Sequence, residues 1–235
     1  MATEKLSSPP RLPGNATPLE ILRIGIEAAD GVVSLACSFS VEDVIIIDLI
    51  TSHDLPVGIF AIDTGRLPEE THEVAEAIVS RYGVGIDWYF PRNDEVERLL
   101  REKGPFSFRE SLANRHQCCH IRKVEPLERA LAGLAGWVTG VRRAHGVTRA
   151  NLAPLEIDGT NGGIVKINPL LDWTDAQVWE YAEARQLPVN RLHHQGYPSI
   201  GCAPCTRAVT PGQPPRSGRW WWEDPEHKEC GLHRR

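Results

Sequence analysis

Short apolar segments that alternate with helical stretches constrain the fold of this chain most strongly. Residues 32–37 and 57–62 have the apolar character of buried strands, and each ends in a polar turn before a helical stretch. Residues 85–90 and 137–141 repeat the pattern further along the chain. Strands that alternate with helices form a largely parallel sheet with helices on its faces. The sequence therefore predicts an α/β fold with a mostly parallel, twisted sheet flanked by helices.

The predicted elements divide the chain into three parts. Residues 1–16 are polar and Pro-rich and predict a disordered leader, whereas residues 17–200 carry the strand and helix pattern of a nucleotide-binding α/β domain. Thr17 and Thr174 begin capping boxes, which predict helices directly after them. Residues 151–168 predict a hairpin. Residues 201–235 have little periodicity, and we interpret them as an irregular tail of the same domain, folded over its active face.

Residues 38–43 form a hydroxyl-rich loop between the first strand and the helix that follows it. The hydroxyl groups of Ser38 and Ser40, together with backbone N–H groups at a helix N-terminus, favour an anion such as a phosphate. Ser40 and Asp43 also have the spacing of a helix cap, which explains the same residues without a ligand. A second polar turn, residues 63–65, follows the next strand. Ligands of open α/β sheets bind at these carboxyl ends of strands.

Four of the six cysteines form two pairs, Cys118-Cys119 and Cys202-x-x-Cys205. Four thiolates are the usual ligand set of a zinc ion or of an iron–sulfur cluster. The side chains of neighbouring residues diverge, so binding both adjacent cysteines to one small ion would strain the backbone. The separate irons of a cubane cluster suit adjacent cysteines better. We therefore favour a [4Fe–4S] cluster, with structural zinc, buried thiols or a disulfide as alternatives.

The bulk composition excludes several classes of protein. The net charge of −5 gives no support to nucleic-acid binding, because proteins that bind nucleic acid usually carry a basic face. No apolar run approaches the roughly 18–20 residues that a membrane helix requires, and the N-terminus has no apolar signal core. We therefore expect a cytoplasmic protein without membrane contact, whose cysteines are ligands or nucleophiles rather than a disulfide framework.

Taken together, the motifs resemble those of the sulfonucleotide reductases, which are relatives of the ATP pyrophosphatases. The resemblance covers about residues 30–235. Because both cysteine pairs are present, the chain is most similar to the assimilatory adenylylsulfate reductases, since phosphoadenylylsulfate reductases generally lack the pairs and bind no cluster. In chain order the motifs are Ser38-Phe39-Ser40, Asp63-Thr64-Gly65, Cys118-Cys119 with Arg122-Lys123, Thr139-Gly140-Val141-Arg142, Cys202-x-x-Cys205, Arg216-x-x-Arg219 and Glu229-Cys230-Gly231-Leu232-His233.

This resemblance implies an activity and the residues that perform it. Adenylylsulfate would be reduced to sulfite and AMP through an S-sulfonate on Cys230, with thioredoxin as the external reductant. The two cysteine pairs would hold a [4Fe–4S] cluster with a structural and electrostatic role. A homo-oligomer is also expected. The implied substrate-binding residues are Ser38, Phe39, Ser40, Thr64, Lys123, Gly140, Arg142, Arg216, Arg219 and His233.

Other interpretations stay open at this point. The enzyme could accept the 3′-phosphorylated substrate, either instead of adenylylsulfate or as well. A cluster-bearing enzyme that thiolates tRNA would usually carry a Ser-Gly-Gly-x-Asp-Ser loop for ATP, and residues 38–43 lack its two glycines. A zinc-stabilised binding module, which would not be an enzyme, is the remaining alternative.

Overall fold

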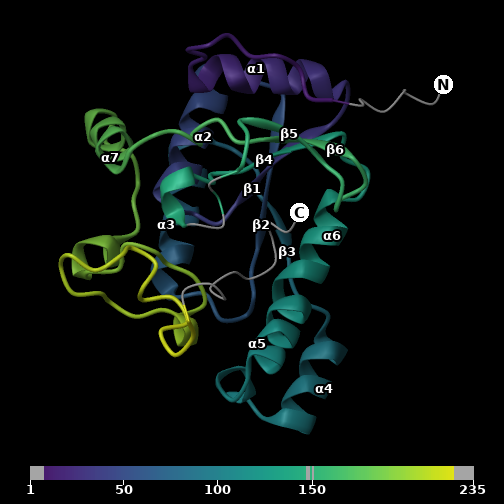
Figure 1. Ribbon diagram of the computed structural model, residues 1–235, viewed down its shortest axis with the longest axis vertical. Helices are drawn as coiled ribbons and strands as arrows, with labels where there is room; N and C mark the ends of the chain where they lie inside the picture. Colours follow the sequence, from purple (N-terminus) through teal and green to yellow (C-terminus); the bar gives the residue numbers. More distant parts are fainter. Residues whose placement is uncertain (1–7, 147–148, 150, 225–235) are drawn as a thin grey trace.

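A six-stranded sheet forms the centre of the computed structural model, which describes residues 8–146, 149 and 151–224 (Figure 1). The strand order is β3-β2-β1-β4-β6-β5. Every neighbouring pair is parallel except β5 and β6, which form the predicted hairpin. The prediction of a mostly parallel sheet is therefore confirmed. The strands are β1 Val33–Cys37, β2 Val57–Ile62, β3 Asp87–Tyr89, β4 Gly136–Val138, β5 Leu155–Asp158 and β6 Ile164–Ile167.

Seven α-helices accompany the sheet in the described part of the chain. Three of them begin with capping boxes at Thr17, Ser40 and Thr174, where the side chain accepts the N–H of the third residue after it. These predicted helix starts are confirmed. None of the described helices is long and apolar enough to span a bilayer. The helices are α1 Pro18–Ala29, α2 Val41–Ser52, α3 Glu69–Tyr82, α4 Asn93–Lys103, α5 Leu112–Cys119, α6 Glu125–Leu131 and α7 Asp175–Ala184.

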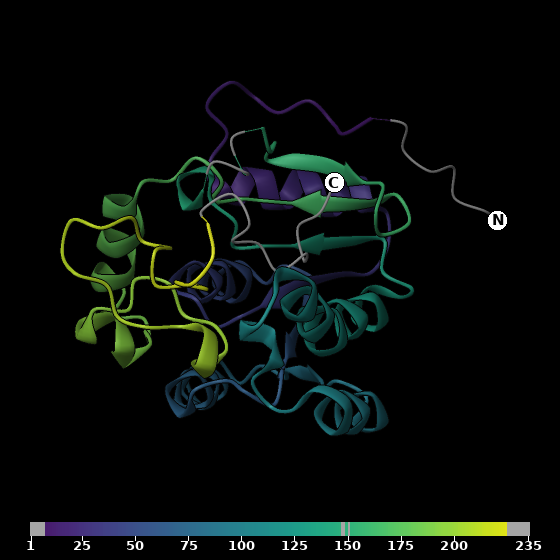
Figure 2. The same ribbon diagram turned by 60° about the horizontal axis from the view of Figure 1, so that its bottom comes forward.

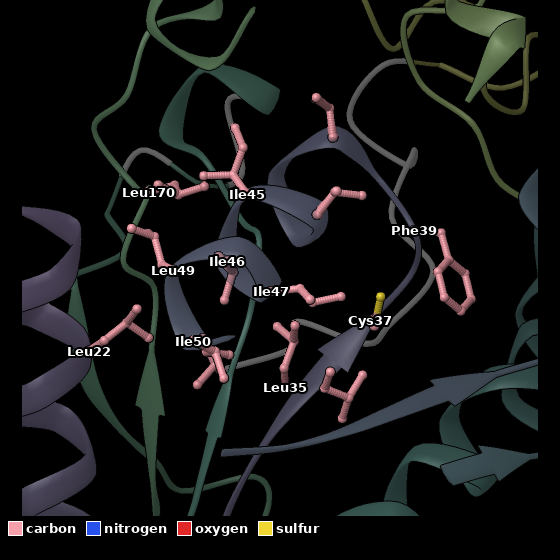
Figure 3. Close-up of a cluster of buried hydrophobic side chains, with 14 of the residues drawn as sticks. Leu22, Leu35, Cys37, Phe39, Ile45, Ile46, Ile47, Leu49, Ile50 and Leu170 are labelled. Atoms are coloured by element: carbon pink, nitrogen blue, oxygen red, sulfur yellow. The ribbon is translucent and has the colours of Figure 1, made fainter. Parts of the chain in front are cut away.

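Alternate residues of β1 pack on opposite faces of the sheet, as the two-residue period of a strand requires. Leu35 and Cys37 join the main core, where α2 contributes an almost wholly buried surface that includes Ile45, Ile46 and Ile47 (Figure 3). Ala36 faces the other way, towards the smaller core beneath α6. Helices therefore cover both faces, and the end of β1 is held rigidly between them.

Residues 107–133, which the sequence predicts to be helical, form several short elements instead of one helix. Helix α5 ends at Cys119, a π-helical turn covers His120–Val124, and α6 follows directly. Pro126 has no N–H to donate to the carbonyl four residues earlier, and its ring crowds that carbonyl. The wider turn accommodates the proline, and π-turns of this kind are frequent at functional sites.

The two ends of the described chain pack against the domain. Leu12 and Ala16, within the predicted leader, contact the main core, while residues 1–7 lie outside the described chain. The loops of residues 201–224, yellow in Figures 1 and 2, lie on the same side of the molecule as α7. Their regular structure amounts to a 3-10 turn at Ala203–Cys205 and a bridge between Thr206 and Arg219.

Candidate functional site

A cavity of about 680 Å³ opens at the carboxyl ends of β1, β2 and β4. The strand order reverses between β1 and β4, which is where open α/β sheets bind ligands, and the volume suits a nucleotide. Cys230 and His233 lie outside the described residues. All the other predicted substrate-binding residues line this cavity, namely Ser38, Phe39, Ser40, Thr64, Lys123, Gly140, Arg142, Arg216 and Arg219.

The loop between β1 and α2 is closed by the carboxylate of Asp43. Its Oδ2 atom accepts the Ser38 N–H and the Ser38 hydroxyl, both at 2.7 Å, and the Ser40 N–H at 3.4 Å. Phe39 between them has a φ of 62°, a left-handed conformation that side chains rarely adopt. Burial raises the pKa of Asp43, against the effect of the Ser38 contacts. The predicted helix cap therefore forms. Asp43 also accepts hydrogen bonds from the N–H and the hydroxyl of Ser38, which precedes the cap residue Ser40.

Arg142 lines the cavity, but its guanidinium is already engaged. Its Nε donates to Glu42 Oε1 at 2.8 Å, and its other nitrogens donate to Asp175 at 2.5 Å and to the Trp173 carbonyl at 3.1 Å. Glu42 and Arg142 are both buried. The two acids offset the positive charge of Arg142, and its predicted contact with a nucleotide stays a prediction.

The tail brings basic groups to the cavity. Arg216 and Arg219 both line it, and the backbone of Gly201 makes room for Arg219. A Cβ atom at Gly201 would lie 2.2 Å from the Arg219 guanidinium, so any side chain there would displace the arginine. Arg149, which is buried and lines the same cavity, belongs to none of the motifs and was not among the predicted substrate-binding residues.

Cys118, Cys119, Cys202 and Cys205 are all buried and share one apolar cluster with Trp220. The cysteines of the described chain form no disulfide, which removes that alternative for these four. No three His, Cys, Asp or Glu side chains in the described chain converge on a single metal-ion position. The four thiols are thus gathered in one place.

Opposing effects set the thiol pKa values in this cluster. Burial would raise the pKa of Cys202, but Lys123, the Thr64 hydroxyl and nearby arginines together bring it below its usual value. Burial and the neighbouring Cys202 raise the pKa of Cys205 to about 12. Basic side chains therefore favour the thiolate form of Cys202, whereas burial favours the neutral thiol of Cys205.

Basic side chains surround the cysteines. Arg66, Arg115, Arg122, Lys123 and Arg219 line a small cavity together with all four of them. The first three are not among the predicted site residues, although Arg122 stands in the motif of the adjacent pair. The sequence does contain a signal for Arg115 and Arg122. Each lies four residues from a cysteine of the adjacent pair, which is the spacing of side-chain neighbours on a helix.

The nucleotide-sized cavity and the cysteine cavity adjoin each other. Lys123, Arg219 and Trp220 line both of them. Thr64, which lines the larger cavity, places its hydroxyl 3.3 Å from Cys202 Sγ, and its carbonyl accepts a 2.6 Å hydrogen bond from Arg122. A ligand in the larger cavity would therefore share side chains with whatever the cysteines hold.

Residues 32–208 match the family model described as the phosphoadenosine phosphosulfate reductase domain. The chain belongs to this family. It is 48% identical over 220 residues to an adenosine 5′-phosphosulfate reductase of Allochromatium vinosum, which spans 94% of this chain and 85% of the relative. A relative of the same description from Burkholderia cepacia is 49% identical over 224 residues, 95% of this chain and 89% of its own. The crystal structure of a phosphoadenylyl-sulfate reductase from Candida auris, a phosphate complex, superimposes with a TM-score of 0.69 at 28% identity, covering 83% of this chain and 91% of that one.

In this member of the phosphoadenosine phosphosulfate reductase family, a buried ion pair joins the tail to the cysteine helix. Arg115 donates from Nε and Nη2 to both carboxylate oxygens of Glu223, at 3.0 and 2.8 Å, and stacks on the Trp220 ring. The side chains are 0% and 8% exposed. The pair fixes the end of the described tail against the helix that carries the adjacent cysteines.

Glu223→Gln should lower stability by about 3–5 kcal/mol, because it removes the carboxylate that neutralises the buried Arg115 charge. The midpoint of urea unfolding measures this change. Glu95→Gln is the matched control, since Glu95 pairs with Arg98 on the exposed surface of α4, where loss of a pair costs less than about 1 kcal/mol. Equal midpoints for the two variants would contradict the role given to Glu223.

Proposed function

We propose that this chain reduces adenylylsulfate to sulfite and AMP, with Cys230 as the nucleophile and thioredoxin as the reductant. The observation that carries the proposal is the meeting of a nucleotide-sized cavity with four buried cysteines through Lys123, Arg219 and Trp220. Relatives described as adenosine 5′-phosphosulfate reductases, nearly half identical over almost the whole chain, support the choice of substrate. We also infer a cytoplasmic enzyme that forms a homo-oligomer.

The basic side chains of the cavity are suited to the charged end of this substrate. Arg216, Arg219, Lys123 and His233 are assigned to the sulfate and the α-phosphate, since arginine makes forked contacts with such oxygens. Three of them are described and line the cavity. The nucleoside end is assigned to the carboxyl ends of the strands, where the lining residues are Ser38, Phe39, Ser40, Thr64, Gly140 and Arg142.

The reaction proceeds as three successive substitutions at sulfur. The Cys230 thiolate attacks the sulfate sulfur, an S–S bond forms, and the bond from that sulfur to the phosphate oxygen breaks, so that AMP leaves with the electron pair. A thiolate of reduced thioredoxin then attacks the Cys230 sulfur and expels sulfite. The second thioredoxin thiol resolves the mixed disulfide, which returns the Cys230 thiol and leaves oxidised thioredoxin. AMP is a good leaving group, so no strong general acid is required.

The cysteine cluster fits a [4Fe–4S] group held by Cys118, Cys119, Cys202 and Cys205. Arg122 Nε, Arg219 Nε and Trp220 Nε1 are buried and have no hydrogen-bond partner among the described residues, although all three side chains line the cysteine cavity. Buried donors are normally satisfied, and sulfur atoms of an anionic cluster would accept from them. When bound, the cluster would supply a fixed negative charge that these basic side chains balance.

The test is a turnover assay with purified protein, adenylylsulfate and reduced thioredoxin. We expect sulfite and AMP to appear at equal rates, and 3′-phosphorylated substrate to be used more slowly. Conversion of ATP to AMP and pyrophosphate, without sulfite from either sulfonucleotide, would contradict the proposal and favour tRNA thiolation.

The colour of the same preparation tests the cofactor. Iron and sulfide give a brown protein with absorption near the violet edge of the visible spectrum, whereas a zinc protein is colourless. A colourless protein that contains one zinc ion per chain would contradict the cluster assignment.

A further inference from the structure

We propose that the Asp43 carboxylate fills the anion position of the loop between β1 and α2, and thereby excludes nucleotides that would place a phosphate or pyrophosphate group there. ATP is the main example of the excluded class. The identity of the accepted substrate rests on the proposed function. The inference adds a class of nucleotides that the same site rejects, and it names Asp43 as the residue that rejects them.

The hydrogen bonds of Asp43 exceed those that a helix cap requires. A capping box accounts for the bond from the Asp43 N–H to Ser40 Oγ at 3.3 Å and for the return bond from the Ser40 N–H. It does not account for the N–H and hydroxyl of Ser38, which both reach the same Asp43 oxygen at 2.7 Å. Three donors that converge from two residues of one loop, Ser38 and Ser40, are what a bound phosphate oxygen would accept.

The other side of the carboxylate is closed by the turn after β4. A Cβ atom at Gly140 would lie 2.3 Å from Asp43 Oδ1 and 3.0 Å from the Glu42 Cβ, so only glycine leaves room there for the acid. Asp43 is 2% exposed. The carboxylate is therefore held between two loops at the carboxyl ends of the central strands β1 and β4, and a ligand phosphate could not reach the loop donors without displacing it.

The distribution of charge in the cavity favours the same conclusion. Glu42, beside Asp43, pairs with Arg142, whereas Asp43 makes no ion pair with any described residue. At the loop end the described acids are therefore either paired, as Glu42 is, or occupied with loop donors, as Asp43 is. Lys123, Arg216 and Arg219 come instead from the segments beside the cysteines. A nucleotide whose anionic end points to the cysteines is attracted, and one whose polyphosphate points to the loop is repelled.

The experiment measures binding of inorganic pyrophosphate and of ATP to the full-length protein by calorimetry. Asp43→Ser removes the carboxylate and frees the three donors, so we expect both probes to bind at least ~10-fold more tightly than to the parent protein, a change of one decade in Kd. Asp43→Asn keeps an oxygen acceptor for Ser38 and removes only the charge, so a smaller gain is expected. Asp43→Asn also tests the inference if Asp43→Ser does not fold.

Asp30→Asn is the matched control, because Asp30 carries the same charge but is exposed at the end of α1, outside the lining of the cavity. Its affinity for pyrophosphate should change little. Unchanged affinity in both folded Asp43 variants would overturn the inference, as would an equal gain in Asp30→Asn. Neither measurement involves sulfite, so failure of the proposed reductase activity would be seen separately, in the turnover assay.

Discussion

Cys230→Ser should abolish sulfite release and leave the iron content of the protein unchanged. The reaction requires a thiolate, and a serine hydroxyl neither ionises near neutral pH nor forms a sulfur–sulfur bond that thioredoxin can attack. Cys230 lies outside the described residues, so its role rests on the sequence motif around it. Sulfite formation and iron per chain are the two quantities to measure.

Cys37→Ala is the control for this variant. Cys37 ends β1 and is buried in the main core, so its loss removes a thiol without touching the tail (Figure 3). We expect Cys37→Ala to keep both iron and sulfite release. Full activity of Cys230→Ser would refute the mechanism, since no other cysteine is assigned as its nucleophile.

Cys202→Ala should remove the proposed [4Fe–4S] cluster and with it most of the activity. Cys202 contacts the Thr64 hydroxyl and has its pKa lowered by Lys123, so it lies where the cysteine cluster meets the substrate cavity. Without an anionic group among them, the buried cations Arg122 and Arg219 would be left uncompensated, which costs several kcal/mol. Iron and sulfide per chain, together with thermal unfolding, measure both effects.

The outcome that contradicts this prediction is a full complement of iron and sulfide in Cys202→Ala. Cys37→Ala again provides the comparison, because it deletes a buried thiol of the main core rather than one of the four. Loss of iron from both variants alike would show that the iron depends on general stability and not on the cysteine pairs.

Most of the fold could be predicted from the sequence because its signals are local. The capping boxes at Thr17, Ser40 and Thr174 fix helix starts through contacts three residues apart, and the bounds of β2 follow from one apolar run. The predicted strands at 85–90 and 137–141 are longer than β3 and β4. Their extent is set by pairing, since β3 has partners only along Phe60–Ile62, and that information is not local.

The site was predicted in part for the same reason. Motif positions placed nine residues that line one cavity, but the pairing of Arg115 with Glu223 spans 108 residues of sequence. The spacing of Ser40 and Asp43 predicted a cap and not the additional contacts of Ser38. Gly201 has no signal of its own, because its importance depends on the Arg219 side chain that lies against it.

The central claim is that four cysteines hold a cofactor while Cys230 alone carries the sulfonate. Mass spectrometry of the protein mixed with adenylylsulfate, without any reductant, tests it most directly. The account predicts a single SO₃ adduct on the peptide that contains Cys230, with AMP released in equal amount. AMP release with an unmodified C-terminal peptide, or with the adduct on another cysteine, would contradict it.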